Sequence, residues 1–123
     1  MTTYPNDLKL LHCPALSAIK AISGKWKTRI LWLLRERRCH FGELRQILRG
    51  VSAKVLSEQI KQLEADGLII RQEEMRQGIA YSFLAYSDYG RSLIPVLDEL
   101  GTWGAEHARR QEQKRSTAAR QAE

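Results

Sequence analysis

Polar side chains recur at helical spacing near the middle of the chain. Lys54, Ser57 and Lys61 fall on one side of a helix that advances 100° per residue, with Glu58 at the edge of this stripe. Lysine and serine donate hydrogen bonds to base edges in the DNA major groove, and lysine also binds phosphate. Ser52, at the expected helix start, adds a hydroxyl beside backbone amides that can bind phosphate. The stripe therefore predicts contacts with nucleic acid, although an ordinary amphipathic surface helix has the same spacing.

Two cysteines are the other candidates for chemistry. Cys13 immediately precedes Pro14 at the expected start of a helix, where the helix N-terminus can stabilise a thiolate. The alternative is an inert cysteine buried at a subunit interface. Cys39 could act as a resolving thiol for Cys13, but the sequence does not give the distance between them.

No pattern in the chain predicts an enzyme. The three histidines, His12, His40 and His107, are scattered, and no Cys/His set has zinc spacing. There is no glycine-rich phosphate loop and no nucleophile elbow. We therefore expect no catalytic residues, no cofactor and no metal.

Composition indicates a soluble globular domain. The chain has 123 residues, 43% of them hydrophobic and 28% charged, and a net charge of +6. The positive charge favours an anionic partner, either nucleic acid or an anionic membrane surface. No apolar run approaches the roughly 18 residues of a membrane span, and the first residues do not resemble a signal peptide. We expect a cytoplasmic protein with reduced thiols and no membrane partner.

Four helices are predicted before residue 67. Apolar spacing and Gly or Pro breaks place them at about 15–22, 25–35, 41–48 and 52–66. The side chains expected to point inward from the second and third helices are Trp26, Ile30, Leu31, Leu33, Leu34, Phe41, Leu44, Ile47 and Leu48. The third helix has a poor N-cap. The connection Arg49–Val51 contains a glycine and has the length of a helix-turn-helix turn.

After Gly67 the period of the apolar pattern changes from 3.6 to 2. This predicts a strand at 68–71, a polar loop at 72–78 and a second strand at 79–86, which together would form a wing. Arg76 is placed nearest a minor groove, while Glu73 and Glu74 would repel phosphate. The inward face of the second strand is either Ile79, Tyr81 and Phe83 or Ser82, Leu84 and Tyr86, because a slip of one residue exchanges the faces.

The last predicted helix begins near Ser87, a suitable N-cap. Leu93, Leu97, Leu100 and Trp103 form an apolar stripe that suggests packing in a dimer. Pro95 lies inside this helix, so a bend is expected there. Residues 107–123 are charged, basic and almost free of large apolar side chains, which predicts a partly disordered tail.

Several blocks of this sequence resemble the HxlR-type winged-helix transcription regulators, which are related to the MarR group. The likeness covers about residues 13–104, and its blocks are Cys13, Gly24-Lys25-Trp26, Phe41-Gly42-Glu43-Leu44, Leu63 to Leu68, and Gly90-Arg91-Ser92-Leu93. The resemblance implies a bacterial cytosolic homodimer that binds operator DNA and dimerises through its N- and C-terminal helices. Many family members respond to electrophiles or oxidants through the cysteine that Cys13 matches. The chain departs from the family pattern in its wing, which lacks prolines before the second strand.

The resulting expectation is an α+β, mainly helical fold: a winged helix-turn-helix DNA-binding domain with N- and C-terminal dimerisation helices. It comprises an N-terminal arm at 1–12, the domain at 13–106 and the basic tail at 107–123. The expected dimer interface contains Leu8, Leu11, Leu16, Leu93, Leu97, Leu100 and Trp103. The expected function is a homodimeric repressor of a palindromic operator, switched by electrophiles or oxidants through Cys13. The alternatives are a small-molecule inducer in a dimer pocket lined by Trp26, Trp32 and Trp103, or a protein- or RNA-binding winged helix.

Overall fold

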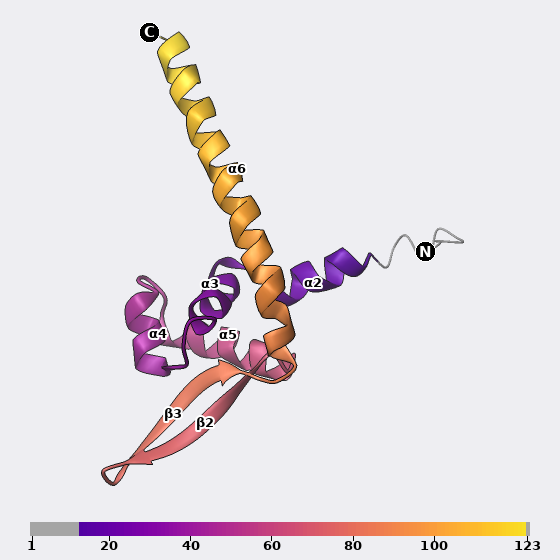
Figure 1. Ribbon diagram of the computed structural model, residues 1–123. Coiled ribbons are helices and arrows are strands. Elements are labelled where there is room, and N and C mark those ends of the chain that lie inside the picture. The colour runs from indigo at the N-terminus through magenta and orange to yellow at the C-terminus, as the bar shows by residue number, and fades with distance from the viewer. Residues whose placement is uncertain (1–12, 123) are drawn as a thin grey trace, which may run out of the picture. The chain divides into compact units, whose positions relative to one another are not determined.

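The computed structural model describes residues 13–122 and confirms the α+β fold (Figure 1). In chain order the elements are α2 (Pro14–Ile22), α3 (Lys25–Leu34), β1 (Cys39–His40), α4 (Phe41–Ile47), α5 (Ala53–Ala65), β2 (Ile69–Arg76), β3 (Ile79–Tyr86), a 3-10 helix (Gly90–Leu93) and α6 (Ile94–Gln121). The chain divides after Gly90 into two compact units. The first unit carries the helix-turn-helix and the wing, and the second consists of the remaining 3-10 turn and α6. Leu8 and Leu11 lie outside the described residues.

The core of the first unit is built from one face of each of three helices. The fully buried side chains from these helices are Ile30 and Leu31 of α3, Leu44 of α4, and Leu56, Ile60 and Leu63 of α5, and the sheet adds Cys39, Ile69 and Leu84. In α5 the spacing of four and three residues directs Leu56, Ile60 and Leu63 to the same side. Trp32, which lies on another side of α3, is 38% exposed. One residue predicted to point inward does not: Ile47 is 46% exposed. That prediction was wrong because helical spacing does not show how wide a face the neighbouring helices cover.

α5 is closed at both ends by its own sequence. The Ser52 hydroxyl accepts a hydrogen bond from the Val55 amide at 3.1 Å, which satisfies one of the amides at the helix start. At the other end the Leu68 amide donates to the Leu63 carbonyl and the Gly67 amide to the Glu64 carbonyl. These two bonds form a Schellman motif, with Gly67 in the left-handed conformation at φ 77°. The helix is therefore a well-defined rod that leads directly into β2.

Three antiparallel strands form a sheet in the order β1-β3-β2. β2 and β3 pair along their whole length, from Ile69 opposite Tyr86 to Arg76 opposite Ile79. Only Gln77 and Gly78 lie between the strands, at φ values of 51° and 79°, as a type I′ hairpin turn requires. The predicted loop over 72–78 was therefore wrong: most of it continues β2. In Figure 1 the hairpin extends well beyond α3, α4 and α5 as a two-stranded wing.

Both faces of β3 are buried at its base. Leu84 and Tyr86 lie on the face toward the helices, and the Tyr86 hydroxyl donates a hydrogen bond to the Leu31 carbonyl. Phe83 points to the other face and is nevertheless only 8% exposed. The Arg38 guanidinium covers its ring at 4.2 Å, and the Tyr81 ring lies beside it with centroids 6.2 Å apart. Neither of the two predicted faces alone is the inward one.

The second unit is dominated by α6. The helix begins at Ile94, so Pro95 lies in its first turn, where no intrahelical donor is needed. The predicted position of Pro95 inside the helix, and the bend expected there, were therefore wrong. Ser87 instead accepts a hydrogen bond from the Gly90 amide at 2.8 Å and donates one to the Gly67 carbonyl. α6 continues through residue 107, where the tail is predicted to begin, as far as Gln121.

Candidate nucleic-acid interface

The exposed side of α5 carries the predicted stripe. Lys54, Glu58 and Lys61 are exposed and Ser57 is half-buried, while the residues on the opposite side of the helix are fully buried. Within the described residues, no ion pair involves Lys54 or Lys61. Their ammonium groups are thus available to a partner. The stripe is held in place by the core behind it, so it can present donors in a fixed arrangement.

The start of α5 adds a second set of donors. The Ser52 oxygen accepts the Val55 amide, but its hydroxyl hydrogen remains free to be donated. The amides of Ala53 and Lys54 precede the first intrahelical bond, which runs from Leu56 to the Ser52 carbonyl at 3.0 Å. Amides at this position point along the helix axis and favour an anion. This geometry suits a phosphate group.

The wing presents an arginine beside a glutamate whose negative charge is balanced by ion pairs. Arg76 contacts Glu74 at 3.2 Å, and Glu74 also pairs with Arg38 from the segment before β1. The hydrogen bond from Arg76, together with that from Arg38, holds the pKa of Glu74 below its ordinary value. The expected repulsion between Glu74 and phosphate is therefore offset by two guanidinium groups. Glu73 remains exposed.

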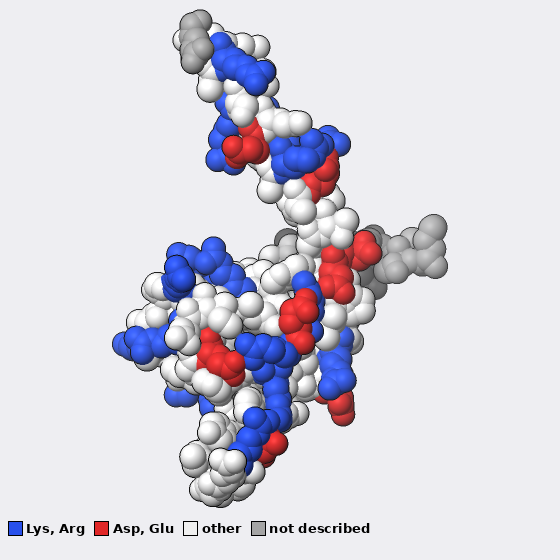
Figure 2. Space-filling view, turned by 60° about the vertical axis from the view of Figure 1, so that its left-hand side comes forward, with Lys and Arg blue, Asp and Glu red and all other residues white. Residues whose placement is uncertain are grey.

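A further ion pair connects the wing to α5. Arg71 of β2 forms two hydrogen bonds with Glu64 of α5, at 3.1 and 3.2 Å. Figure 2 shows Lys and Arg side chains in several groups on the face in view, with Asp and Glu side chains between them. The positive charge is thus distributed over this face. Attraction of an anionic partner depends on the arginines and lysines that form no ion pair with a carboxylate.

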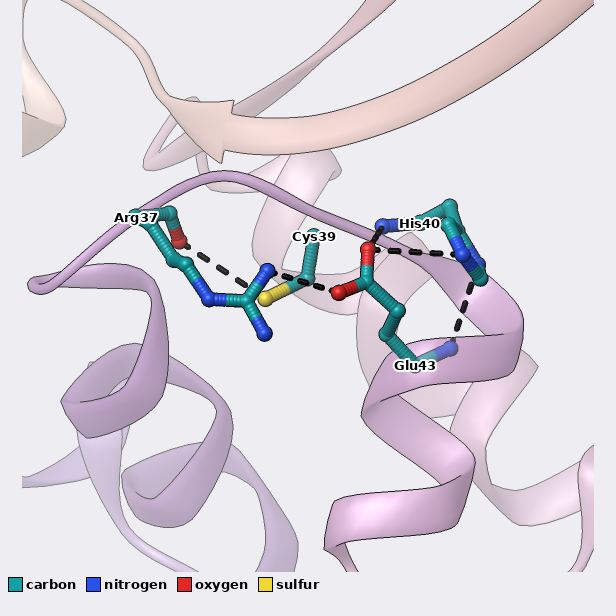
Figure 3. Close-up of polar contacts among 4 residues, drawn as sticks. All are labelled: Arg37, Cys39, His40 and Glu43. Carbon is teal, nitrogen blue, oxygen red and sulfur yellow. Dashed lines mark hydrogen bonds and ion pairs between the residues drawn. The ribbon is translucent and has the colours of Figure 1, made fainter.

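The first helix of the helix-turn-helix has a cap that the sequence did not reveal. His40 Nδ1 accepts the Glu43 amide at 3.1 Å, and the Glu43 carboxylate accepts the His40 amide at 3.2 Å, so the two residues form a capping box at the start of α4 (Figure 3). Arg37 contacts the same carboxylate at 2.6 Å. The prediction of a poor N-cap was therefore wrong. It failed because histidine is an unusual capping residue. The glutamate three residues after it was the available signal.

These contacts shift the ionisation of Glu43 and Arg37. The hydrogen bond from Arg37, and then that from the His40 amide, lower the pKa of Glu43. The same bond raises the pKa of Arg37. The pair stays ionised at neutral pH and connects the segment before β1 to the start of α4.

The two cysteines have different surroundings. Cys13 is exposed and occupies the N-cap position of α2, with its carbonyl accepting the Leu16 amide at 3.0 Å. Cys39 is 1% exposed, lies beside the Arg37–Glu43 pair and has its sulfur 3.7 Å from the Arg37 carbonyl (Figure 3). Burial raises the pKa of the Cys39 thiol, which disfavours its thiolate. Cys13 is the more accessible thiol.

The described residues predicted to form a dimer interface differ in exposure. Leu16, Leu100 and Trp103 are 44%, 48% and 66% exposed, Leu93 is half-buried and Leu97 is already buried in the single chain. Further apolar exposure comes from Ile19 of α2 and Val96 of α6. Trp103 stacks on His107 of the same helix, with ring centroids 4.9 Å apart.

The described part of the chain contains neither a candidate metal site nor a membrane-spanning helix. Between residues 13 and 122, no three His, Cys, Asp or Glu side chains gather closely enough to hold a metal ion. Over the same residues, none of the helices is both long and apolar enough to cross a membrane.

Residues 21–112 match the family described as HxlR-like helix-turn-helix. The chain belongs to the HxlR family. It is 41% identical over 94 residues to the uncharacterized HTH-type transcriptional regulator YdzF of Bacillus subtilis, an alignment that covers 76% of this chain and 85% of that protein. The resemblance noted from the sequence is thereby confirmed, and the HxlR protein described here is a transcriptional regulator with a helix-turn-helix DNA-binding fold.

Solved structures agree with this assignment. The HTH-type transcriptional regulator ytcD superposes with a TM-score of 0.69 at 34% identity, over 79% of this chain and 98% of that one. The redox regulator HypR in its reduced form superposes with a TM-score of 0.74 at 25% identity, over 82% of this chain and 99% of that one. The winged-helix architecture is shared with both.

Proposed function

We propose that this HxlR-family chain is a homodimeric repressor that places α5 in the major groove of a palindromic operator. The observation that carries the proposal is the pair of opposed faces of α5. One is fully buried in the core, and the other bears lysines that form no ion pair with any residue between 13 and 122. A helix of ordinary width fits a major groove about 12 Å wide. The packed core behind α5 holds the helix backbone in place, so the lysines keep their positions when the helix approaches DNA.

Each predicted contact residue has a role in this arrangement. Lys54, near the start of α5, donates to guanine O6 or N7, and Ser57 donates to several base edges. Glu58 is suited to accept from the amino group of cytosine. Lys61, further along the helix, and Ser52, at its start, contact phosphates, and Arg76 at the wing tip lies in the adjacent minor groove.

Exposed apolar side chains support the dimer. α2 exposes Leu16 and Ile19, and α6 exposes Val96, Leu100 and Trp103. Apolar clusters of this kind usually mark a protein interface. If these helices pair two chains, the operator has two half-sites related by two-fold symmetry.

Substitution of the two lysines tests the DNA contacts. We expect Lys54→Ala to reduce affinity for the operator more than affinity for random DNA, by about 1–3 kcal/mol of discrimination. Lys61→Ala should weaken both about equally and reduce the slope of log K against log salt by about 0.9. Lys114→Ala, at an exposed lysine of α6, is the control. Fluorescence titrations in which both α5 variants bind like wild type would refute the assignment. Weak, salt-insensitive binding of wild type to every duplex would favour a protein- or RNA-binding role.

A thiol switch at Cys13 is the finer part of the proposal. Cys13 is exposed at the start of α2, and HypR, whose structure is similar, is named a redox regulator. Alkylation of the Cys13 thiolate by an electrophile would attach a new group beside the apolar face of α2. Diamide would instead oxidise two thiols to a disulfide and be reduced to the hydrazine. The second thiol would be Cys13 of the other chain, or Cys39 after local opening exposes it.

Cysteine variants separate these possibilities. After diamide treatment, non-reducing gels report migration and DNA titration reports affinity. Cys13→Ser should abolish the diamide-dependent change in both. Cys39→Ser should preserve both if the disulfide joins two Cys13 residues and abolish both if Cys39 is the resolving thiol. Wild-type protein that keeps its migration and its DNA affinity after diamide would exclude the switch.

A further inference from the structure

A groove of about 440 Å³ lies between α3 and α4 in the first unit. Trp32 and Leu33 of α3, Ile47 of α4 and Leu48 just after it supply its apolar lining, and Arg29 and Arg49 also line it. The volume is within the range of small-molecule sites, which are mostly apolar with a few polar groups that fix orientation. Neither Trp26 nor Trp103 lines this groove, so it differs from the tryptophan pocket considered from the sequence.

The apolar lining is only partly covered within the described chain. Trp32 and Ile47 lie on the sides of their helices that the core leaves uncovered, and they are 38% and 46% exposed. The Arg35 guanidinium rests on the Trp32 ring at 3.7 Å, which restricts the indole. A largely preformed apolar surface of this size would release water on binding another apolar group.

The two arginines of the groove differ from several other arginines of the first unit. Arg37, Arg38, Arg71 and Arg76 each form an ion pair with a glutamate. No ion pair within residues 13–122 involves Arg29 or Arg49, although the Arg29 guanidinium lies 5.5 Å from the centre of the Trp26 ring. Unmatched guanidinium groups beside an apolar surface favour a ligand that is apolar at one end and anionic at the other.

We propose that the α3–α4 groove binds an amphipathic organic anion, namely an aromatic or bulky aliphatic carboxylate. Its apolar body packs on Trp32, Ile47 and the adjacent leucines, and its carboxylate accepts hydrogen bonds from Arg29 or Arg49. Arg49 is three residues before Ser52, the N-cap of α5. A ligand held by Arg49 therefore restrains the turn that sets the position of α5. This regulatory consequence rests on the proposed DNA-binding function, whereas binding of the anion does not.

Calorimetric titration of the full chain with naphthalene-2-carboxylate tests the site. Saturable binding is expected, with weaker binding of the isosteric neutral naphthalene-2-carboxamide. Arg29→Gln and Arg49→Gln should each raise the Kd for the carboxylate about two- to fivefold, in the range of a solvent-exposed ion pair, and leave that for the carboxamide nearly unchanged. Arg45→Gln, at an exposed arginine of α4 that does not line the groove, should bind the carboxylate like wild type.

Several outcomes would overturn the proposal. These are no saturable binding of the carboxylate, equal affinity for the carboxamide, or an equal loss in Arg45→Gln. Ile47→Ser provides a further check, since its exposed position should tolerate the change and circular dichroism verifies the fold. If sedimentation shows that the wild-type protein is a dimer and Ile47→Ser is a monomer, the groove is a subunit interface instead.

DNA titration with and without saturating carboxylate separates binding of the anion from its effect on DNA affinity. A change in operator affinity that Arg49→Gln reduces supports the coupling, and unchanged affinity despite calorimetric binding refutes the coupling alone. Failure of the wild-type protein to bind duplex DNA would refute the proposed function, while the calorimetric result would still decide the groove.

Discussion

Replacement of Gly90 by alanine should destabilise the fold strongly. A β-carbon at this position would overlap the carbonyl oxygen of Leu68 and lie 2.8 Å from its carbonyl carbon. Both atoms belong to backbone that cannot rotate away, and the same carbonyl accepts the Ser87 amide at 3.0 Å. The backbone before β2 or the 3-10 helix must therefore shift.

The magnitude follows from the nature of this overlap. Overpacking of a well-packed site typically costs about 1–3 kcal/mol, and a clash with backbone belongs at the upper end, so we expect at least about 2 kcal/mol for Gly90→Ala. For a domain of this size each kcal/mol lowers the melting temperature by roughly 4 °C. Leu68 connects the end of α5 to β2, so the same shift should also weaken DNA binding.

Urea unfolding followed by circular dichroism and tryptophan fluorescence, at fixed protein concentration, measures the loss. Gly104→Ala is the matched control: its β-carbon would meet nothing within 4 Å in this chain, and alanine is favoured over glycine in a helix by about 1 kcal/mol. The control should be neutral or more stable. A Gly90→Ala protein within about 0.5 kcal/mol of wild type, the range of ordinary surface substitutions, would refute the close-approach argument.

Three further substitutions test other contacts. Tyr86→Phe removes the hydroxyl that donates to the Leu31 carbonyl and should cost about 0.5–1.5 kcal/mol in urea unfolding, and no loss would mean that this bond contributes nothing. Glu43→Gln should lower the melting temperature at pH 7. The pKa of Glu43 is lower in the folded protein than its ordinary value of about 4.5, so the carboxylate stabilises the fold fully above that pH. This stabilisation is lost as the pH falls through the pKa of Glu43 in the folded protein. The two melting curves should converge in acid, and a difference independent of pH would contradict this cause. Gln77→Asn should relieve part of the roughly 1 kcal/mol cost of the left-handed conformation at φ 51° and slow amide exchange at the wing tip, whereas faster exchange would argue against the type I′ turn.

Much of the fold was predictable because it is encoded locally. The apolar residues of α5 recur at helical intervals between a serine cap and a glycine stop, so the helix and its two faces follow from the sequence. The lysine stripe is the complement of that apolar face. The candidate DNA-contacting residues of α5 thus follow from helical spacing alone, and their roles in DNA binding remain predictions.

Other features were predicted incorrectly because their signals were weak or indirect. The capping box at His40 uses an uncommon cap, and the loop predicted at 72–78 has too few apolar residues to show a strand period. Pro95 was placed inside a helix because the apolar stripe begins before it, although the α-helix begins only at Ile94. In each case a hydrogen-bonding pattern, rather than hydrophobic spacing, determined the boundary.

The sequence by itself determined which segments form helices, which side of α5 is apolar and to which family the chain belongs, because these depend on the order of neighbouring residues. Tertiary structure alone decided that Phe83 and Leu84 are both buried, that Glu74 is neutralised by Arg38, that Cys39 is inaccessible and that Trp32 and Ile47 border an open groove. The reason is physical: burial and charge pairing are set by groups that lie far apart in the chain, and no periodicity within one segment records which of them will meet.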